Sequence, residues 1–131
     1  MPQKDIELLL MRQLASYLAV PILVVDPAGT LLFYNEPAEG LLGCRFEESG
    51  ALPFAEWTRL FPMTAEDGTP LPPEARPLGT GLQQQRATHG AFRIQGFNGI
   101  SRRVEVTAFP LAGQGGRHVG AVVIFWQGRE P

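Results

Sequence analysis

The sequence predicts an α+β domain in which helices cover an antiparallel sheet. Apolar residues near the N-terminus recur every three to four positions, as they do along one face of an amphipathic helix. Val104, Val106 and Ala108 alternate with polar residues, which is typical of a strand with one buried face. Asn98-Gly99 separates that strand from an earlier apolar run, and this dipeptide favours a tight hairpin.

Length and composition are those of one domain. The chain has 131 residues, and 44% of them are hydrophobic, which is enough to fill one continuous core. With 11 basic and 13 acidic residues, the net charge of -2 gives no positive field of the kind that nucleic acids or anionic membranes select. The apolar runs are much shorter than a bilayer span. We therefore expect no nucleic-acid partner and no membrane partner.

The cysteine content and the N-terminus indicate a cytoplasmic protein. Cys44 is the single cysteine, so no intrachain disulfide can form, as is usual in a reducing compartment. Lys4, Asp5 and Glu7 stand among the first apolar residues, where a secretory signal would have a basic start and a small-residue cleavage site.

The N-terminal third predicts a helix, two strands and a short helix. The first helix runs from Ile6 to Leu18 and is followed by Pro21. Strands are expected at residues 22–25 and 30–34, joined by the turn Asp26-Pro27-Ala28-Gly29. Asn35 is expected to cap a helix that ends near Leu42.

The middle of the chain predicts short helical turns and one longer helix. Proline and glycine interrupt residues 43–73, where one turn carries Trp57 and Phe61 at an i,i+4 spacing. The longer helix is expected from Glu74 to Gln85, with Leu78 and Leu82 facing inward. Three strands follow, at residues 91–97, 102–109 and 119–126.

Local signatures, taken in order, resemble those of the PAS family. Ile22-Leu23-Val24-Val25-Asp26 with Gly29 resembles its opening strand and Asp-x-x-Gly turn, and Asn35 with Pro37-Ala38-Glu39 resembles its capped helix. Residues 67–72 with Arg76-Pro77-Leu78 are similar to the loop before the long helix in PAS domains of bacterial sensor kinases and regulators. Pro110-Leu111 and Gly120-Ala121-Val122 match the last strands, so the resemblance covers Leu18 to Trp126.

The resemblance implies a five-stranded antiparallel sheet with short helices and one longer helix on one face, preceded by the N-terminal amphipathic helix. Residues 1–19 would form a capping or dimerisation helix, residues 20–128 the PAS domain and residues 129–131 a tail. The chain departs from the family at its end, where Gln127-Gly128-Arg129 stands in place of an Asp that begins the output linker of many members.

The function implied is that of a sensory or regulatory module in signal transduction, as in two-component systems. Such a module binds a small apolar ligand or a protein partner and relays its state through the N-terminal helix and the sheet. The alternative is a PAS module that binds no ligand and serves in dimerisation or protein interaction. We expect no enzyme activity, because no serine lies in a nucleophile elbow and no glycine-rich loop precedes a helix with Lys-Ser or Lys-Thr.

Two sets of side chains are candidates for the site that this function needs. The resemblance implies that a ligand pocket or a packed core would be lined by Trp57, Phe61, Leu78, Leu82, Phe92, Ile94 and Ile124, with Tyr34 or Arg93 to orient a ligand. The stripe of the N-terminal helix would pack on its own sheet or on a second copy, and it comprises Ile6, Leu10, Leu14, Tyr17 and Leu18. We expect a homodimer, with a signalling protein or an effector domain as a further partner.

Cofactors are not expected, although a haem or flavin sensor remains a further alternative. Gly43-Cys44-Arg45-Phe46 resembles the flavin-adduct motif of light-sensing PAS relatives, but it comes earlier in the chain and directly follows the first short helix. His89 is expected in a turn beyond the longer helix and His118 in a loop, where neither suits an axial haem ligand. No spacing of histidine, cysteine or carboxylates predicts a metal site.

Overall fold

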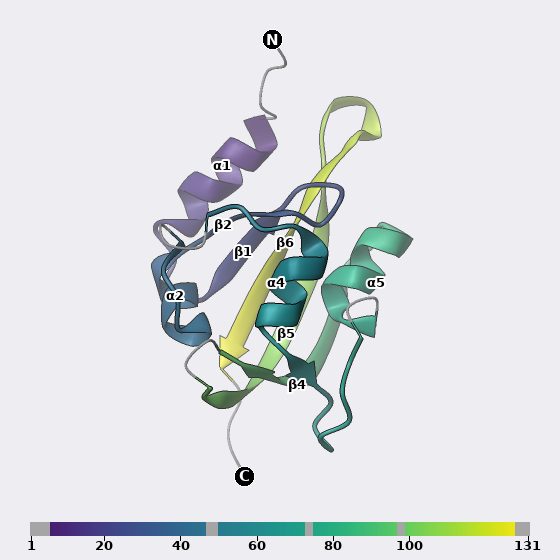
Figure 1. The fold of residues 1–131 in the computed structure, drawn as a ribbon. Coiled ribbons are helices and arrows are strands. Elements are labelled where there is room, and N and C mark those ends of the chain that lie inside the picture. Colours follow the sequence, from purple (N-terminus) through teal and green to yellow (C-terminus); the bar gives the residue numbers. More distant parts are fainter. Residues whose placement is uncertain (1–5, 47–49, 73–74, 97–98, 128–131) are drawn as a thin grey trace.

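The computed structural model describes residues 6–46, 50–72, 75–96 and 99–127. The helices of this part are α1 (Ile6–Ala15), α2 (Glu36–Leu42), α4 (Phe54–Leu60) and α5 (Pro77–Gln84). The strands are β1 (Ile22–Val25), β2 (Leu31–Tyr34), β3 (Met63–Thr64), β4 (Thr88–Gln95), β5 (Ser101–Ala112) and β6 (His118–Gln127). All pairings are antiparallel, and the strand order is β2-β1-β6-β5-β4-β3. The α+β class is confirmed (Figure 1).

The sheet has six strands in the described residues, one more than predicted. The additional strand is β3, whose two residues pair with Ile94 and Arg93 at the sheet edge. A segment of two residues shows no periodicity, so its assignment depends on its partner in space. Pairing with β5 likewise makes β4 longer than predicted. The strand begins at Thr88, which lies opposite Ala108, whereas the predicted strand begins at residue 91.

Two helices are shorter than predicted. α5 spans eight residues and begins at Pro77. Proline suits the first helical position, because it has no backbone N–H and the N–H groups of the first turn have no partner within the helix. Glu74, its predicted start, lies outside the described residues. α1 ends at Ala15, where the backbone N–H groups of Tyr17 and Leu18 bond to carbonyls three residues back and tighten the last turn. The predicted stripe residues Tyr17 and Leu18 therefore follow the helix.

The hairpin between β4 and β5 is confirmed. Gln95 lies opposite Ser101, and the Gly99 N–H donates to the Gly96 carbonyl within the turn. Asn98 lies outside the described residues. Gly99 has a φ of 81°, a left-handed conformation that costs glycine little.

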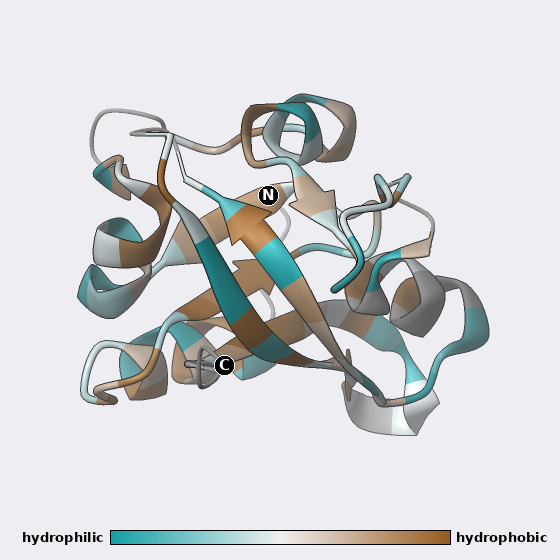
Figure 2. Cartoon of the chain, turned by 90° about the horizontal axis from the view of Figure 1, so that it is seen from below, coloured by the Kyte–Doolittle hydropathy of each residue, from teal (hydrophilic) through white to brown (hydrophobic). Residues whose placement is uncertain are grey.

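Hydrophobic residues make up much of the strands (Figure 2), and because side chains alternate along a strand, they form an apolar cluster on each face of the sheet. The inner face packs against α2, α4 and α5 in the larger core, to which the strands contribute Leu23, Val25, Leu31, Tyr34, Met63, Ile94, Val104, Val106, Ala108, Ala121, Val123 and Phe125. The outer face packs against α1 through a smaller cluster that contains Ile22, Val24, Val122 and Ala15. α4 and α5 lie in front of the sheet in Figure 1, and α1 lies across its upper left.

The side chain of Asn35 joins the segments that meet at the start of β1. Its Oδ1 accepts from the N–H of Ala38, which confirms the predicted helix cap, and also from the N–H of Ile22 at 3.0 Å. Its Nδ2 donates to the carbonyls of Ala15 and Val20, each at 2.9 Å. Asn35 is buried, so each of these backbone groups would lose its partner without access to water. One amide thus holds the end of α1, the start of β1 and the start of α2 together.

Replacement of Asn35 by alanine should lower the free energy of unfolding by about 3 kcal/mol, the sum of a lost helix cap and of buried carbonyls left without donors. Urea unfolding followed by circular dichroism measures this. Asn35→Asp is the matched variant, because aspartate caps helices as well as asparagine but has no N–H to donate. It should be at least as unstable at neutral pH, and wild-type stability in Asn35→Asp would contradict a contribution from the two Nδ2 bonds.

Candidate functional sites in the core and on the N-terminal helix

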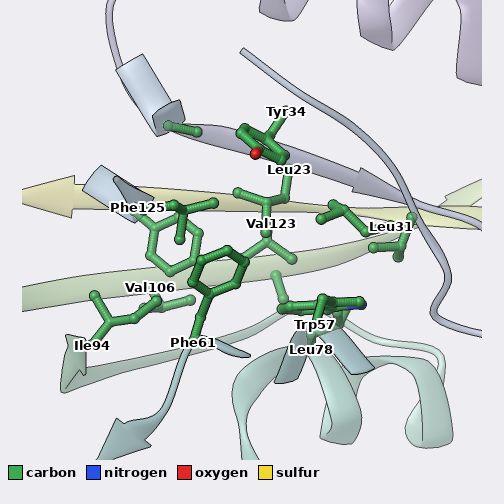
Figure 3. Close-up of a cluster of buried hydrophobic side chains, with 14 of the residues drawn as sticks. Leu23, Leu31, Tyr34, Trp57, Phe61, Leu78, Ile94, Val106, Val123 and Phe125 are labelled. Carbon is green, nitrogen blue, oxygen red and sulfur yellow. The ribbon is translucent and has the colours of Figure 1, made fainter. Parts of the chain in front are cut away.

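The predicted lining residues of the inner face meet in one packed cluster (Figure 3). Trp57 and Phe61 come from α4 and its C-terminal end, Leu78 from α5, Ile94 from β4 and Tyr34 from β2, and all are buried. Leu82 and Phe92 are partly buried and pack against the same cluster. These seven side chains therefore lie together between the sheet and the helices that cover it, and ligand binding by them stays a prediction.

The polar ends of the two largest side chains bond to the backbone. Trp57 Nε1 donates to the carbonyl of Gly29 at 2.9 Å, which ties α4 to the turn between β1 and β2. The Tyr34 hydroxyl donates to the carbonyl of Cys44 at 2.8 Å, beyond the end of α2. These bonds satisfy groups that a ligand would otherwise contact. The Tyr34 hydroxyl could therefore donate to a ligand, as predicted, only by giving up its bond to the backbone after α2.

Arg93 and Ile124 were predicted for the inner face, and the structure places both on the outer face. Arg93 Nε donates to Ser101 Oγ at 3.2 Å and alternates with the inner residue Ile94. Ile124 packs in the cluster beneath α1 and pairs with Ile22. β6 is apolar on both faces, so its sequence carries no signal for which residues face the larger core.

Cys44 lies outside the core, in the segment after α2. Together with Glu36, Glu39, Gly40 and Arg45 it borders an open surface pocket, and its Sγ lies 3.6 Å from the carbonyl of Arg45. A flavin packed on the inner sheet face would not meet this thiol. The residues present therefore do not fit a flavin–cysteine adduct in the core.

Both histidines lie in strands, and the predicted turn and loop positions are wrong. His89 belongs to β4 and His118 begins β6. The His89 ring is exposed on the outer face, where Nδ1 lies 2.8 Å from Thr107 Oγ1. Among the described residues, no group of three or more His, Cys, Asp or Glu side chains is arranged to hold a metal ion.

Arg76 is a buried arginine that joins the start of α5 to the end of α4, a role that the sequence analysis did not assign to it. Arg76 precedes α5, and its guanidinium donates to the carbonyls of Thr58 at 3.0 Å and Phe61 at 3.2 Å, at the end of α4. Burial lowers the pKa of Arg76, but the ordinary pKa of arginine is so high that the group stays charged. The cation satisfies helix C-terminal carbonyls where the helix dipole favours positive charge.

Replacement of Arg76 by methionine, which keeps the length of the stem, should cost about 2 kcal/mol of stability, because two buried carbonyls lose their donors. The denaturation midpoint in urea measures the change. Arg76→Lys is the matched variant, since its single ammonium keeps the charge but lacks the planar fork, and it should recover only part of the loss. Full stability of Arg76→Met would show that the two bonds add nothing.

α1 packs on the outer face of the sheet with one side only. Ala15 is fully buried, and Leu8 and Met11 pack against the same cluster. The Arg12 guanidinium lies 4.8 Å from the ring centre of Phe33 on β2. Gly120 of β6 permits this approach, because a β-carbon there would come within 3.0 Å of Leu8 and would clash with the Val25 carbonyl.

The stripe predicted for α1 lies away from the sheet. Its residues remain exposed in the single chain: Ile6 by 62%, Leu10 by 57%, Leu14 by 49%, Tyr17 by 80% and Leu18 by 38%. The helix does fold back on its own sheet, which was one of the two options, but it packs there through Leu8, Met11 and Ala15 and not through the predicted stripe. Contact with a second copy stays a prediction.

Comparison with known proteins defines the fold. No family model matches the chain, and no curated protein matches it in sequence. Solved structures do match over most of its length. The PAS domain of BvgS from Bordetella pertussis has a TM-score of 0.70 and 19% identity, with 96% of this chain and 89% of that one covered.

Two further PAS domains have similar values. A domain from Colwellia psychrerythraea has a TM-score of 0.65 at 20% identity, with 94% and 97% of the two chains covered. The domain of nitrogen regulation protein NR(II) from Vibrio parahaemolyticus has a TM-score of 0.65 at 17% identity, with 90% and 97% covered. The chain therefore has the PAS fold, as its sequence predicted. None of the described helices has the length and apolar character that a membrane span requires.

Proposed function

We propose that this chain is a regulatory module of signal transduction that forms a homodimer through α1. The observation that carries the proposal is the exposed apolar face of α1 and of the turn after it, comprising Ile6, Leu10, Leu14 and Tyr17. Soluble proteins rarely leave such a continuous apolar stripe in water, and stripes of this kind mark contacts with other proteins. A second copy presents the same stripe, so a two-fold contact would cover both at once.

The docking of α1 supports a role for this helix in relaying a signal. Leu8, Met11 and Ala15 fix one side of α1 to the sheet, and Asn35 ties its end to β1 and α2. A change in the α2 region would therefore reach α1 through one side chain. The similarity in fold to a PAS domain of a nitrogen regulation protein agrees with a regulatory role.

The packing of the inner face favours protein contact over an apolar ligand in the core. Trp57, Phe61 and Ile94 are buried in one cluster, and Trp57 Nε1 is already bonded to the backbone. A ligand between the sheet and α4 would have to displace such side chains, with loss of their packing. The proposal therefore includes no resident haem or flavin in this core. It also includes no enzyme activity, which the sequence motifs led us to expect.

Sedimentation equilibrium of the purified chain over a range of concentrations tests the dimer. We expect a reversible dimer in the wild type. Leu10→Glu should raise its dissociation constant by about 100-fold, because it places a charge in the centre of an apolar contact. Ile100→Glu is the control, since Ile100 is also an apolar side chain that is 49% exposed but lies in the turn directly before β5, far along the chain from α1.

A monomeric wild type at every concentration would overturn the proposal, as would a dimer that Leu10→Glu leaves unchanged. Leu10 is more than half exposed, so its replacement should not unfold the domain. Equal thermal transitions for the wild type and both variants would confirm this.

A further inference from the structure

A pocket of about 280 Å³ opens between α2 and the ends of β5 and β6. Pro37 and Leu41 of α2 form one wall, and Val104 and Phe125 form the other. None of its described lining residues comes from α4 or α5, so the pocket is distinct from the packed space between those helices and the sheet. Its volume suits a small molecule.

Arg102 is the one charged side chain among the described residues that line this pocket. It lies opposite Ile94 and, like Val104, points to the inner face of the sheet. Its Nε is buried without a hydrogen-bond partner, and within the described part of the chain Arg102 forms no ion pair. The side chain as a whole is half-buried, so its guanidinium lies at the pocket with no acidic partner among the described residues.

The acidic side chains of α2 do not neutralise Arg102. Glu36 and Glu39 border the neighbouring surface pocket beside Cys44, and Glu39 Oε2 accepts from the N–H of Phe46. The pocket thus combines apolar walls with a guanidinium whose planar donors match a carboxylate.

The construction of α2 keeps the pocket open. Gly40 lies inside the helix, where glycine is unfavourable, yet a β-carbon at this position would meet no heavy atom within 4 Å. Packing therefore does not require glycine here, and Gly40 lines both this pocket and the surface pocket beside Cys44, so a larger side chain would take up open space at that boundary. At Gly96, by contrast, packing does require glycine, because a β-carbon there would lie 2.7 Å from the Leu41 carbonyl. This contact shows that α2 lies close to the end of β4.

We propose that this pocket binds a small organic carboxylate with an apolar body, such as a short acyl chain or one aromatic ring. The carboxylate pairs with the Arg102 guanidinium, and the apolar body lies against Leu41, Val104 and Phe125. Pro21 and Pro37 also line the pocket, and Asn35 bonds to the segments that carry them. A bound molecule would therefore touch the segments that hold α1. The binding site does not depend on dimer formation.

Titration of the isotope-labelled chain with benzoate and with hexanoate, followed by amide chemical shifts, tests the site. Benzamide and hexanamide are the neutral probes of matching shape. We expect both carboxylates to shift the amide signals of Gly40, Leu41 and Val104, with at least tenfold tighter binding than their amides. Binding at other residues only, or equal affinity for acid and amide, would overturn the proposal.

Arg102→Met should weaken carboxylate binding at least tenfold. Arg103→Met is the matched control, because it removes the same charge one residue away on the outer face, where Arg103 pairs with Glu66, and it should bind as the wild type does. Gly40→Leu gives an independent test that leaves the charge in place, and it should also weaken binding at least tenfold. Wild-type affinity in a folded Arg102→Met, or an equal loss in Arg103→Met, would overturn the assignment. Should Arg102→Met fail to fold, wild-type affinity in Gly40→Leu would overturn it.

Discussion

The side-chain amide of Asn35 is the constraint on which the arrangement of the other elements depends. It is buried, and its oxygen and nitrogen bond to backbone groups of four segments: α1, the link after it, β1 and α2. A backbone carbonyl or N–H that is buried without a partner is costly, and here one side chain supplies both the donors and the acceptor that these segments need. Asparagine has two N–H donors and an acceptor oxygen, whereas an ionised aspartate has no donor and serine has only one.

Two consequences follow for the rest of the molecule. Because the end of α1 is held beside the start of β1, the helix can reach the outer face of the sheet, where Leu8, Met11 and Ala15 pack. Because the start of α2 is held at the same point, the helix lies over the inner face and forms one wall of the pocket at Arg102. The proposed dimer contact and the proposed carboxylate site are thus joined through a single buried amide, which explains how occupancy of one could influence the other.

Much of the candidate site could be predicted from the sequence, and the misses have specific causes. Trp57, Phe61 and Leu78 were correctly placed together, because their spacing and apolar character leave one way to bury them. Ile124 was assigned to the wrong face because β6 is apolar on both sides, so its sequence does not show which residues face the larger core. Arg93 was assigned to the wrong face although it alternates with the inner residues Phe92 and Ile94 on β4. On α1, apolar residues occur around most of the helix, so periodicity could not tell the stripe that packs on the sheet from the exposed one. Arg102 carried no signal at all, because its significance comes from what surrounds it.

By itself, the sequence determined the fold class, the capping role of Asn35, the hairpin between β4 and β5 and most of the larger core. These features depend on local chemistry: side-chain alternation, turn residues and a helix cap act over a few neighbouring positions. Only the tertiary structure decided the edge strand β3, the direction in which each face of α1 points, the bonds from Asn35 to α1 and the pocket beside Arg102. Each of these joins residues far apart in the chain, and such pairing is set by register and packing, which no local pattern records.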